Sequence, residues 1–135
     1  MNFEEKTLES ECVYSGKIMK ITRDEVEIAS GRKSFREVVH HSGGVVILAI
    51  TDKNTILTVK QFRYPIKETF LELPAGKLEK GEEPDFAARR ELEEETGYRA
   101  NKWTALGYIY TSPGYSDEKL YLYRAEDLEF VGEHP

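Results

Sequence analysis

The sequence has few of the residues on which several protein classes depend. Cys12 is the only cysteine among 135 residues, which excludes a disulfide framework and a zinc cluster built from cysteines. Such a lone cysteine is expected to be a buried small hydrophobic residue rather than a nucleophile. The net charge is −6 and there is no basic run, so the chain lacks the positive surface that binds nucleic acid.

Long hydrophobic runs are missing as well. The longest apolar run, residues 45–50, is far shorter than the roughly 20 residues that cross a bilayer. Residues 1–30 contain acids throughout and no apolar run, so no signal peptide is visible. We therefore expect a cytoplasmic protein without a membrane partner, and the length predicts a single domain over residues 1–135.

One stretch, residues 76–98, concentrates the chemistry of the sequence. It reads GKLEKGEEPDFAARRELEEETGY. Pro84 suits the first turn of a helix, where its missing N–H is not needed, and Gly97 suits a left-handed stop after the last turn. We therefore predict a helix of about a dozen residues between them, close to the average length in globular proteins.

Three acids of this predicted helix share one face. Glu91, Glu94 and Glu95 stand at positions i, i+3 and i+4. Like charges on one face repel, which points to a hard divalent cation outside the helix as their partner. Glu82 and Arg90 are placed to form an ion pair that holds the carboxylates. The spacing alone leaves a solvated acidic face and a cation site as alternatives.

The same stretch resembles the box of the Nudix hydrolases. That box has the pattern G-x5-E-x7-R-E-U-x-E-E-x-G-U, in which U is a bulky apolar residue, and Tyr98 places an aromatic residue at its last position. The resemblance extends over about residues 10–125 and is closest to the ADP-ribose pyrophosphatase branch. The matching residues of the box are Gly76, Glu82, Arg90, Glu91, Leu92, Glu94, Glu95 and Gly97.

Most of the remaining chain has patterns typical of strands. Mixed sheets around one acidic helix predict an α+β fold, and the resemblance implies a Nudix-like α/β/α sandwich with a mixed sheet. We expect N-terminal antiparallel strands in residues 1–43, a catalytic core in residues 44–126, and a shortened C-terminal strand and helix. The expected strands are residues 12–28 (one bent strand or two), 33–40, 45–51, 55–62, 70–73, 103–110 and 119–125.

The resemblance also implies a function. It implies Mg²⁺-dependent hydrolysis of the diphosphate bond of ADP-ribose, or of a related nucleoside diphosphate sugar, to AMP and ribose 5-phosphate, with Mn²⁺ as a second candidate ion. It implies a homodimer in which residues 1–43 are the dimerisation element. Two alternatives stay open: another nucleoside diphosphate derivative such as NADH or a diadenosine polyphosphate, and a non-catalytic module that binds a nucleotide sugar. The box acids are all present, which favours the enzyme.

Within the box, and at the residue just before it, the resemblance assigns roles residue by residue. Glu91 and Glu95 are implied as the principal metal ligands, and Glu94 joins or supports them in catalysis. The main-chain carbonyl of Ala75 is implied as a further ligand. Glu82 is implied to orient the site or to bind a second metal through water. The structural positions of the box are Gly76, Arg90 and Gly97.

Four residues outside the box complete the predicted site. Glu118 ends the segment SPGYSDE, which resembles the loop that carries the candidate base of ADP-ribose hydrolysing members; without that resemblance it is a solvated loop acid. Arg36 and Arg63 match positions that bind the phosphates or the terminal ribose, although arginines in strands are usually at sheet edges. Glu72 is placed to accept bonds from ribose hydroxyls or to hold an arginine.

Overall fold

The computed structural model describes residues 2–132, which form two compact units. Among the described residues, the first unit comprises residues 2–42 and 110–119, and the second comprises residues 43–109 and 120–132. The break after residue 42 lies beside the boundary expected between residues 43 and 44. The description of residues 1–135 as one Nudix domain stays a prediction.

The first unit is built on a three-stranded antiparallel sheet. Its strands are β1 (Lys6–Ser15), β2 (Met19–Glu27) and β3 (Lys33–His41), in the order β1-β2-β3. The stretch expected as one bent strand or two is therefore divided between two strands. β1 is exposed along its whole length, so Cys12 is exposed and the expectation of a buried cysteine is wrong.

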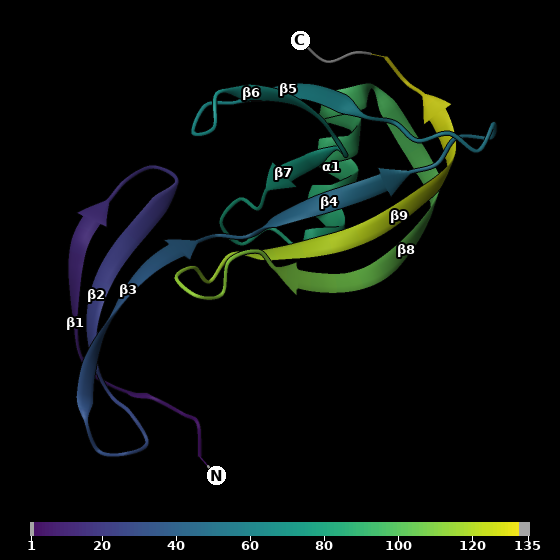
Figure 1. Cartoon of the computed structure of the whole chain (residues 1–135). Coiled ribbons are helices and arrows are strands. Elements are labelled where there is room, and N and C mark those ends of the chain that lie inside the picture. The colour runs from purple at the N-terminus through teal and green to yellow at the C-terminus, as the bar shows by residue number, and fades with distance from the viewer. Residues whose placement is uncertain (1, 133–135) are drawn as a thin grey trace. The chain divides into compact units, whose positions relative to one another are not determined.

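The second unit contains a mixed sheet and a separate hairpin. The four-stranded sheet has the order β7-β4-β9-β8 (Figure 1). β4 runs parallel to β9 and antiparallel to β7, which places the apolar run of β4 in the centre of the sheet. The hairpin pairs β5 with β6. The strands are β4 (Gly44–Ala49), β5 (Val59–Arg63), β6 (Glu68–Glu72), β7 (Ala75–Lys77), β8 (Tyr98–Tyr110) and β9 (Lys119–Phe130).

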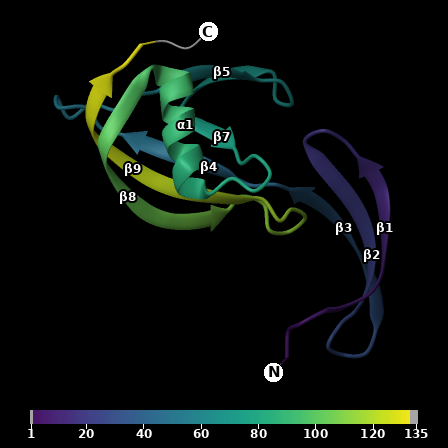
Figure 2. The same ribbon diagram turned by 180° about the vertical axis from the view of Figure 1, so that it is seen from behind.

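Helix α1 (Pro84–Thr96) lies across one face of this sheet (Figure 2). Its 13 residues confirm the predicted length, with proline in the first turn and Gly97 in the left-handed conformation at φ 76°. The helix buries small residues and one leucine against the strands, which lets it approach the sheet closely. The buried apolar residues of the core are Val45, Ile47, Ala49, Ala87, Ala88, Leu92, Ala100, Tyr123 and Ala125.

The mixed sheets and the helix confirm the α+β fold. An α/β/α sandwich has a helical layer on each side of the sheet, and residues 2–132 contain one helix, α1. Several strand boundaries differ from expectation: β5 begins four residues later, β6 two residues earlier and β8 five residues earlier, and β9 continues to Phe130. In addition, β7 forms where a turn was expected. β7 has no strand pattern of its own and exists because it pairs with β4. No helix in the described part of the chain is long and apolar enough to span a membrane.

Candidate active site

Glu91 and Glu95 lie one helical turn apart on the side of α1 that faces β7. Gly76 of β7 approaches this face so closely that a Cβ atom there would overlap the carboxylate of Glu91. Only glycine leaves room for that carboxylate beside the strand. The glycine that opens the box is therefore required by the position of one of the box acids.

Arg90 organises the acids on this side of the helix. Its Nε donates to Glu82 Oε2 at 2.7 Å, and its Nη1 donates to Glu91 Oε1 at 2.9 Å and to Glu94 Oε2 at 3.2 Å. The ion pair expected between Glu82 and Arg90 is thus present. The Arg90 guanidinium, together with the Glu79 N–H, lowers the pKa of Glu82 to about 2.

Glu91 and Glu95 differ from Glu82 because burial is the largest cause of the shift in their pKa values. Partial burial and the neighbouring Glu91 carboxylate raise the pKa of Glu95 to about 7, although a hydrogen bond from the Ala75 N–H opposes the rise. Burial also raises the pKa of Glu91, against the opposing effect of Arg90. A cation bound nearby would favour the charged form of both carboxylates, beyond the partial compensation that Arg90 gives Glu91 and Arg63 gives Glu95.

The donor set fits a hard divalent cation. Glu91 and Glu95 offer carboxylate oxygens at i and i+4, which is the type of ligand that Mg²⁺ takes. Within residues 2–132, no group of three or more His, Cys, Asp or Glu side chains is arranged to hold a metal ion. Mg²⁺ commonly binds through one or two carboxylates and keeps several waters, so a complete protein cage is not required.

Arg63 and Glu72 face one another across the β5–β6 hairpin. Arg63 Nε donates to Glu72 Oε2 at 2.8 Å, and Arg63 Nη2 donates to Glu72 Oε1. The hydrogen bond from Arg63 lowers the pKa of Glu72, and the charge of Arg63 slightly offsets the rise in the pKa of Glu95. The second unit therefore brings Arg63 and Glu72 together, and it brings Arg63 within electrostatic reach of the acids on α1.

The other predicted residues, Arg36 and Glu118, lie in the first unit. Arg36 donates to Glu5 at 2.8 Å from β3. Glu118 accepts a hydrogen bond from Thr111 Oγ1 at 2.7 Å and lies 3.4 Å from His41 Nδ1. The loop that carries Glu118 is thus attached to the end of β3.

Two histidines that sequence reasoning left without a role secure this loop. Asp117 accepts from the His41 N–H at 2.9 Å and contacts His40 Nδ1 at 3.0 Å. Burial raises the pKa of Asp117, but these hydrogen bonds outweigh it, and the net shift is downward. His40 Nε2 in turn contacts Thr22 Oγ1 at 2.9 Å. The only signal in the sequence was a pair of histidines at the end of a strand.

Comparisons with known proteins agree with this geometry. The NUDIX domain model matches residues 40–134. An ADP-ribose pyrophosphatase of Bacillus subtilis (strain 168) is 50% identical over 132 residues, covering 98% of this chain and 71% of that protein. A methanol dehydrogenase activator of Bacillus methanolicus is 48% identical over 126 residues, covering 93% and 68%.

A solved structure shows the same fold. The crystal structure of an ADP compounds hydrolase superposes with a TM-score of 0.84 at 24% identity, covering 100% of this chain and 76% of that one. The chain belongs to the Nudix family. It is a Nudix pyrophosphohydrolase, and its similarity to the Bacillus subtilis protein places it in the ADP-ribose pyrophosphatase branch.

Proposed function

We propose that the chain hydrolyses the diphosphate bond of ADP-ribose, or of a related nucleoside diphosphate sugar, to AMP and ribose 5-phosphate. The observation that carries the proposal is the pair of acids Glu91 and Glu95 beside Gly76, with pKa values raised as expected for a cation site. The similarity to a protein named ADP-ribose pyrophosphatase supports the substrate.

Glu91 and Glu95 would hold Mg²⁺, or Mn²⁺ in its place, with Glu94, Glu82 and the Ala75 carbonyl in supporting roles. When bound, the ion neutralises charge on the diphosphate and lowers the pKa of a bound water. Arg90 fixes the direction of the carboxylates through its bonds to Glu82, Glu91 and Glu94. It acts on the reaction by positioning these acids.

Arg63 would bind the diphosphate. A guanidinium forms paired hydrogen bonds with phosphate oxygens, and Glu72 holds the Arg63 side chain in a fixed direction until the substrate arrives. Arg36 is the second candidate for the phosphates or the terminal ribose. A phosphate oxygen would replace the Glu5 carboxylate that Arg36 binds now.

Glu118 is the proposed general base. It would take the proton from the attacking water, whose oxygen forms a bond to phosphorus while the bridging P–O bond breaks and the second phosphate leaves. Thr111 and His41 orient its carboxylate, and Asp117 attaches the loop to β3. A base in a loop needs such fixed partners because a loop has few packed neighbours.

A homodimer in the cytoplasm, with no nucleic-acid or membrane partner, completes the proposal. β1 is exposed along its length and is an edge strand, and such edges pair readily with a second chain. Light scattering on the purified chain measures its mass directly. A mass twice the 15.5 kDa of one chain is expected, and a mass of one chain would contradict the dimer.

Turnover with a panel of substrates tests the function. ADP-ribose, NADH, diadenosine polyphosphates and nucleoside triphosphates are incubated with Mg²⁺ or with a chelator, and a phosphatase that attacks only the products releases phosphate. We expect the largest turnover with ADP-ribose and none with the chelator. Greater turnover with NADH or a diadenosine polyphosphate would show that this compound, and not ADP-ribose, is the substrate. Folded protein that is inactive on every substrate would indicate a binding module.

A further inference from the structure

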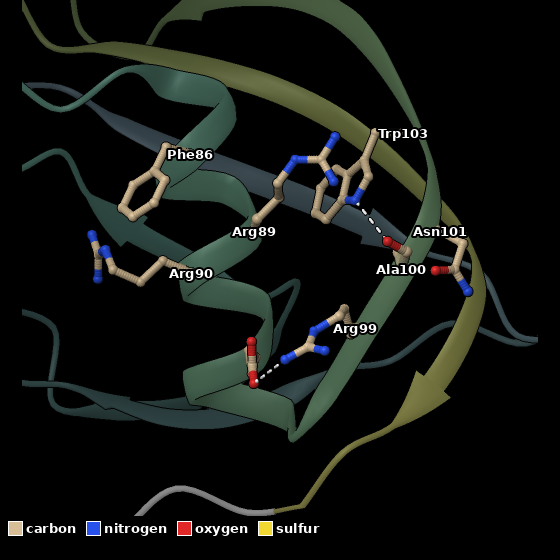
Figure 3. Close-up of a pocket in the computed structure, with 8 residues that line it drawn as sticks. Phe86, Arg89, Arg90, Arg99, Ala100, Asn101 and Trp103 are labelled. Carbon is tan, nitrogen blue, oxygen red and sulfur yellow. Dashed lines mark hydrogen bonds and ion pairs between the residues drawn. The ribbon is translucent and has the colours of Figure 1, made fainter.

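A pocket of about 500 Å³ lies between α1 and the start of β8, and its lining includes Arg90, which also pairs with acids of the box. Figure 3 shows Arg89 and Trp103 facing one another there, while Arg90 points away. Arg89 and Glu91 are two residues apart and so lie about 200° apart around the helix axis. The described residues that line the pocket do not include the box acids Glu82, Glu91, Glu94 and Glu95.

Arg89 and Trp103 form a cationic and aromatic surface in this pocket. The Arg89 Cζ atom lies 5.1 Å from the centre of the Trp103 ring. Trp103 Nε1 donates to the Ala100 carbonyl at 3.1 Å, which fixes the direction of the indole ring. A guanidinium over an indole offers a flat surface on which a planar ring can stack, and it keeps its N–H donors.

The acids near Arg89 are engaged elsewhere. Asp85, four residues before it, hydrogen-bonds Tyr123, and Glu93, four residues after it, pairs with Arg99 at 3.1 Å. Within residues 2–132, Arg89 forms no ion pair, although acids stand at both positions where a helix usually pairs charges. Among residues 2–132 the pocket thus presents Arg89 without an ion-pair partner, beside an Arg99–Glu93 ion pair that also lines it.

From this arrangement we infer that the pocket binds a nucleoside monophosphate, with the base stacked on the Arg89–Trp103 surface and the phosphate between Arg89 and Arg99. Stacking on aromatic and guanidinium planes is how proteins hold single bases, and arginine suits phosphate. The pocket volume lies in the range of small-molecule sites, about 300–1,000 Å³. Asn101, also in the lining, offers an amide to the edge of the base.

Trp103 makes the test direct because it is the only tryptophan in the chain. Its fluorescence is titrated with AMP, with adenosine and with inorganic phosphate. A saturable change with AMP is expected, with much weaker changes for adenosine and for phosphate, because each supplies half of the recognised groups. No saturable change with millimolar AMP would overturn the inference.

Variants separate this pocket from the active site. Arg89→Ala should weaken AMP binding at least about tenfold, the size expected for losing a charged hydrogen-bonded contact. Lys102→Ala removes the same charge one residue from Trp103, outside the pocket, and should bind AMP as the wild type does. Glu93→Gln should tighten binding because it releases Arg99. Equal affinity in Arg89→Ala and Lys102→Ala would contradict the site.

Two further controls keep the result decisive. Arg89→Lys retains the positive charge and the fold but loses the planar group, and an intermediate affinity is expected. The AMP signal should also persist in Glu95→Gln and in the presence of a chelator, whether or not the chain hydrolyses ADP-ribose. A signal that disappears in Glu95→Gln would come from the active site and would refute the second pocket.

Discussion

The two units hold their candidate site residues by different means. In the second unit, α1 is anchored by Ala87, Ala88 and Leu92, which are fully buried, and three acids of the box project from this packed helix. In the first unit, the buried residues within the described chain are Val26 and Thr22. Glu118 is held there by hydrogen bonds instead. The comparison teaches that packing fixes the proposed metal site, whereas polar contacts fix the proposed base.

The largest effect is expected at the packed site. Glu95→Gln keeps the shape of the side chain but removes the charge that would hold the ion. Turnover of ADP-ribose at saturating Mg²⁺ should fall by about a hundredfold or more, which corresponds to about 3 kcal/mol in the barrier. Near-normal turnover, measured by phosphate release, would remove Glu95 from the metal site.

A pair of leucine substitutions compares the stability of the two units. Leu92→Ala leaves a cavity at a site that is 0% exposed and should lower the free energy of unfolding by about 2 to 5 kcal/mol. Leu8→Ala in β1, where the leucine is 38% exposed, should cost less than about 1 kcal/mol. Urea unfolding measures both. Similar losses would show that the first unit packs as tightly as the second.

Arg63→Ala tests substrate binding in the second unit. Removing the guanidinium loses a phosphate contact that is made before and during the reaction. KM for ADP-ribose should therefore rise by about tenfold, the size expected for the loss of a charged contact, and kcat should fall by less. Lys60→Ala, an exposed cation on the same strand, is the matched control. An unchanged KM in Arg63→Ala would exclude Arg63 from the binding site.

The smallest effect is expected in the polar attachment of the loop. The folded pKa of Asp117 lies below its ordinary 3.8, so its contribution to stability is present above that pH and is lost as the pH falls below it. Asp117→Asn should be less stable than the wild type at neutral pH. The difference in urea midpoint should close in acid. A difference that persists in acid would show that the Asp117 charge has no role.

The sequence predicts the packed part of the molecule best. Proline and glycine mark both ends of α1, and the spacing of its acids places them on one face. β7 was missed because its strand form depends on β4, which lies about 30 residues away in sequence. The His40–Asp117 contact joins residues 77 positions apart, and no local pattern predicts such a pair. Local signals predict elements, and distant pairing requires the fold.

The binding of Mn²⁺ to the purified chain tests the central claim most directly. Electron paramagnetic resonance distinguishes free from bound Mn²⁺ in the wild type, in Glu95→Gln and in Glu129→Gln, where an exposed acid far along β9 is changed. We predict that Glu95→Gln weakens binding at least about tenfold, since one of two charged ligands is lost, while Glu129→Gln binds as the wild type does. Equal binding by all three proteins would contradict a metal site built on Glu91 and Glu95.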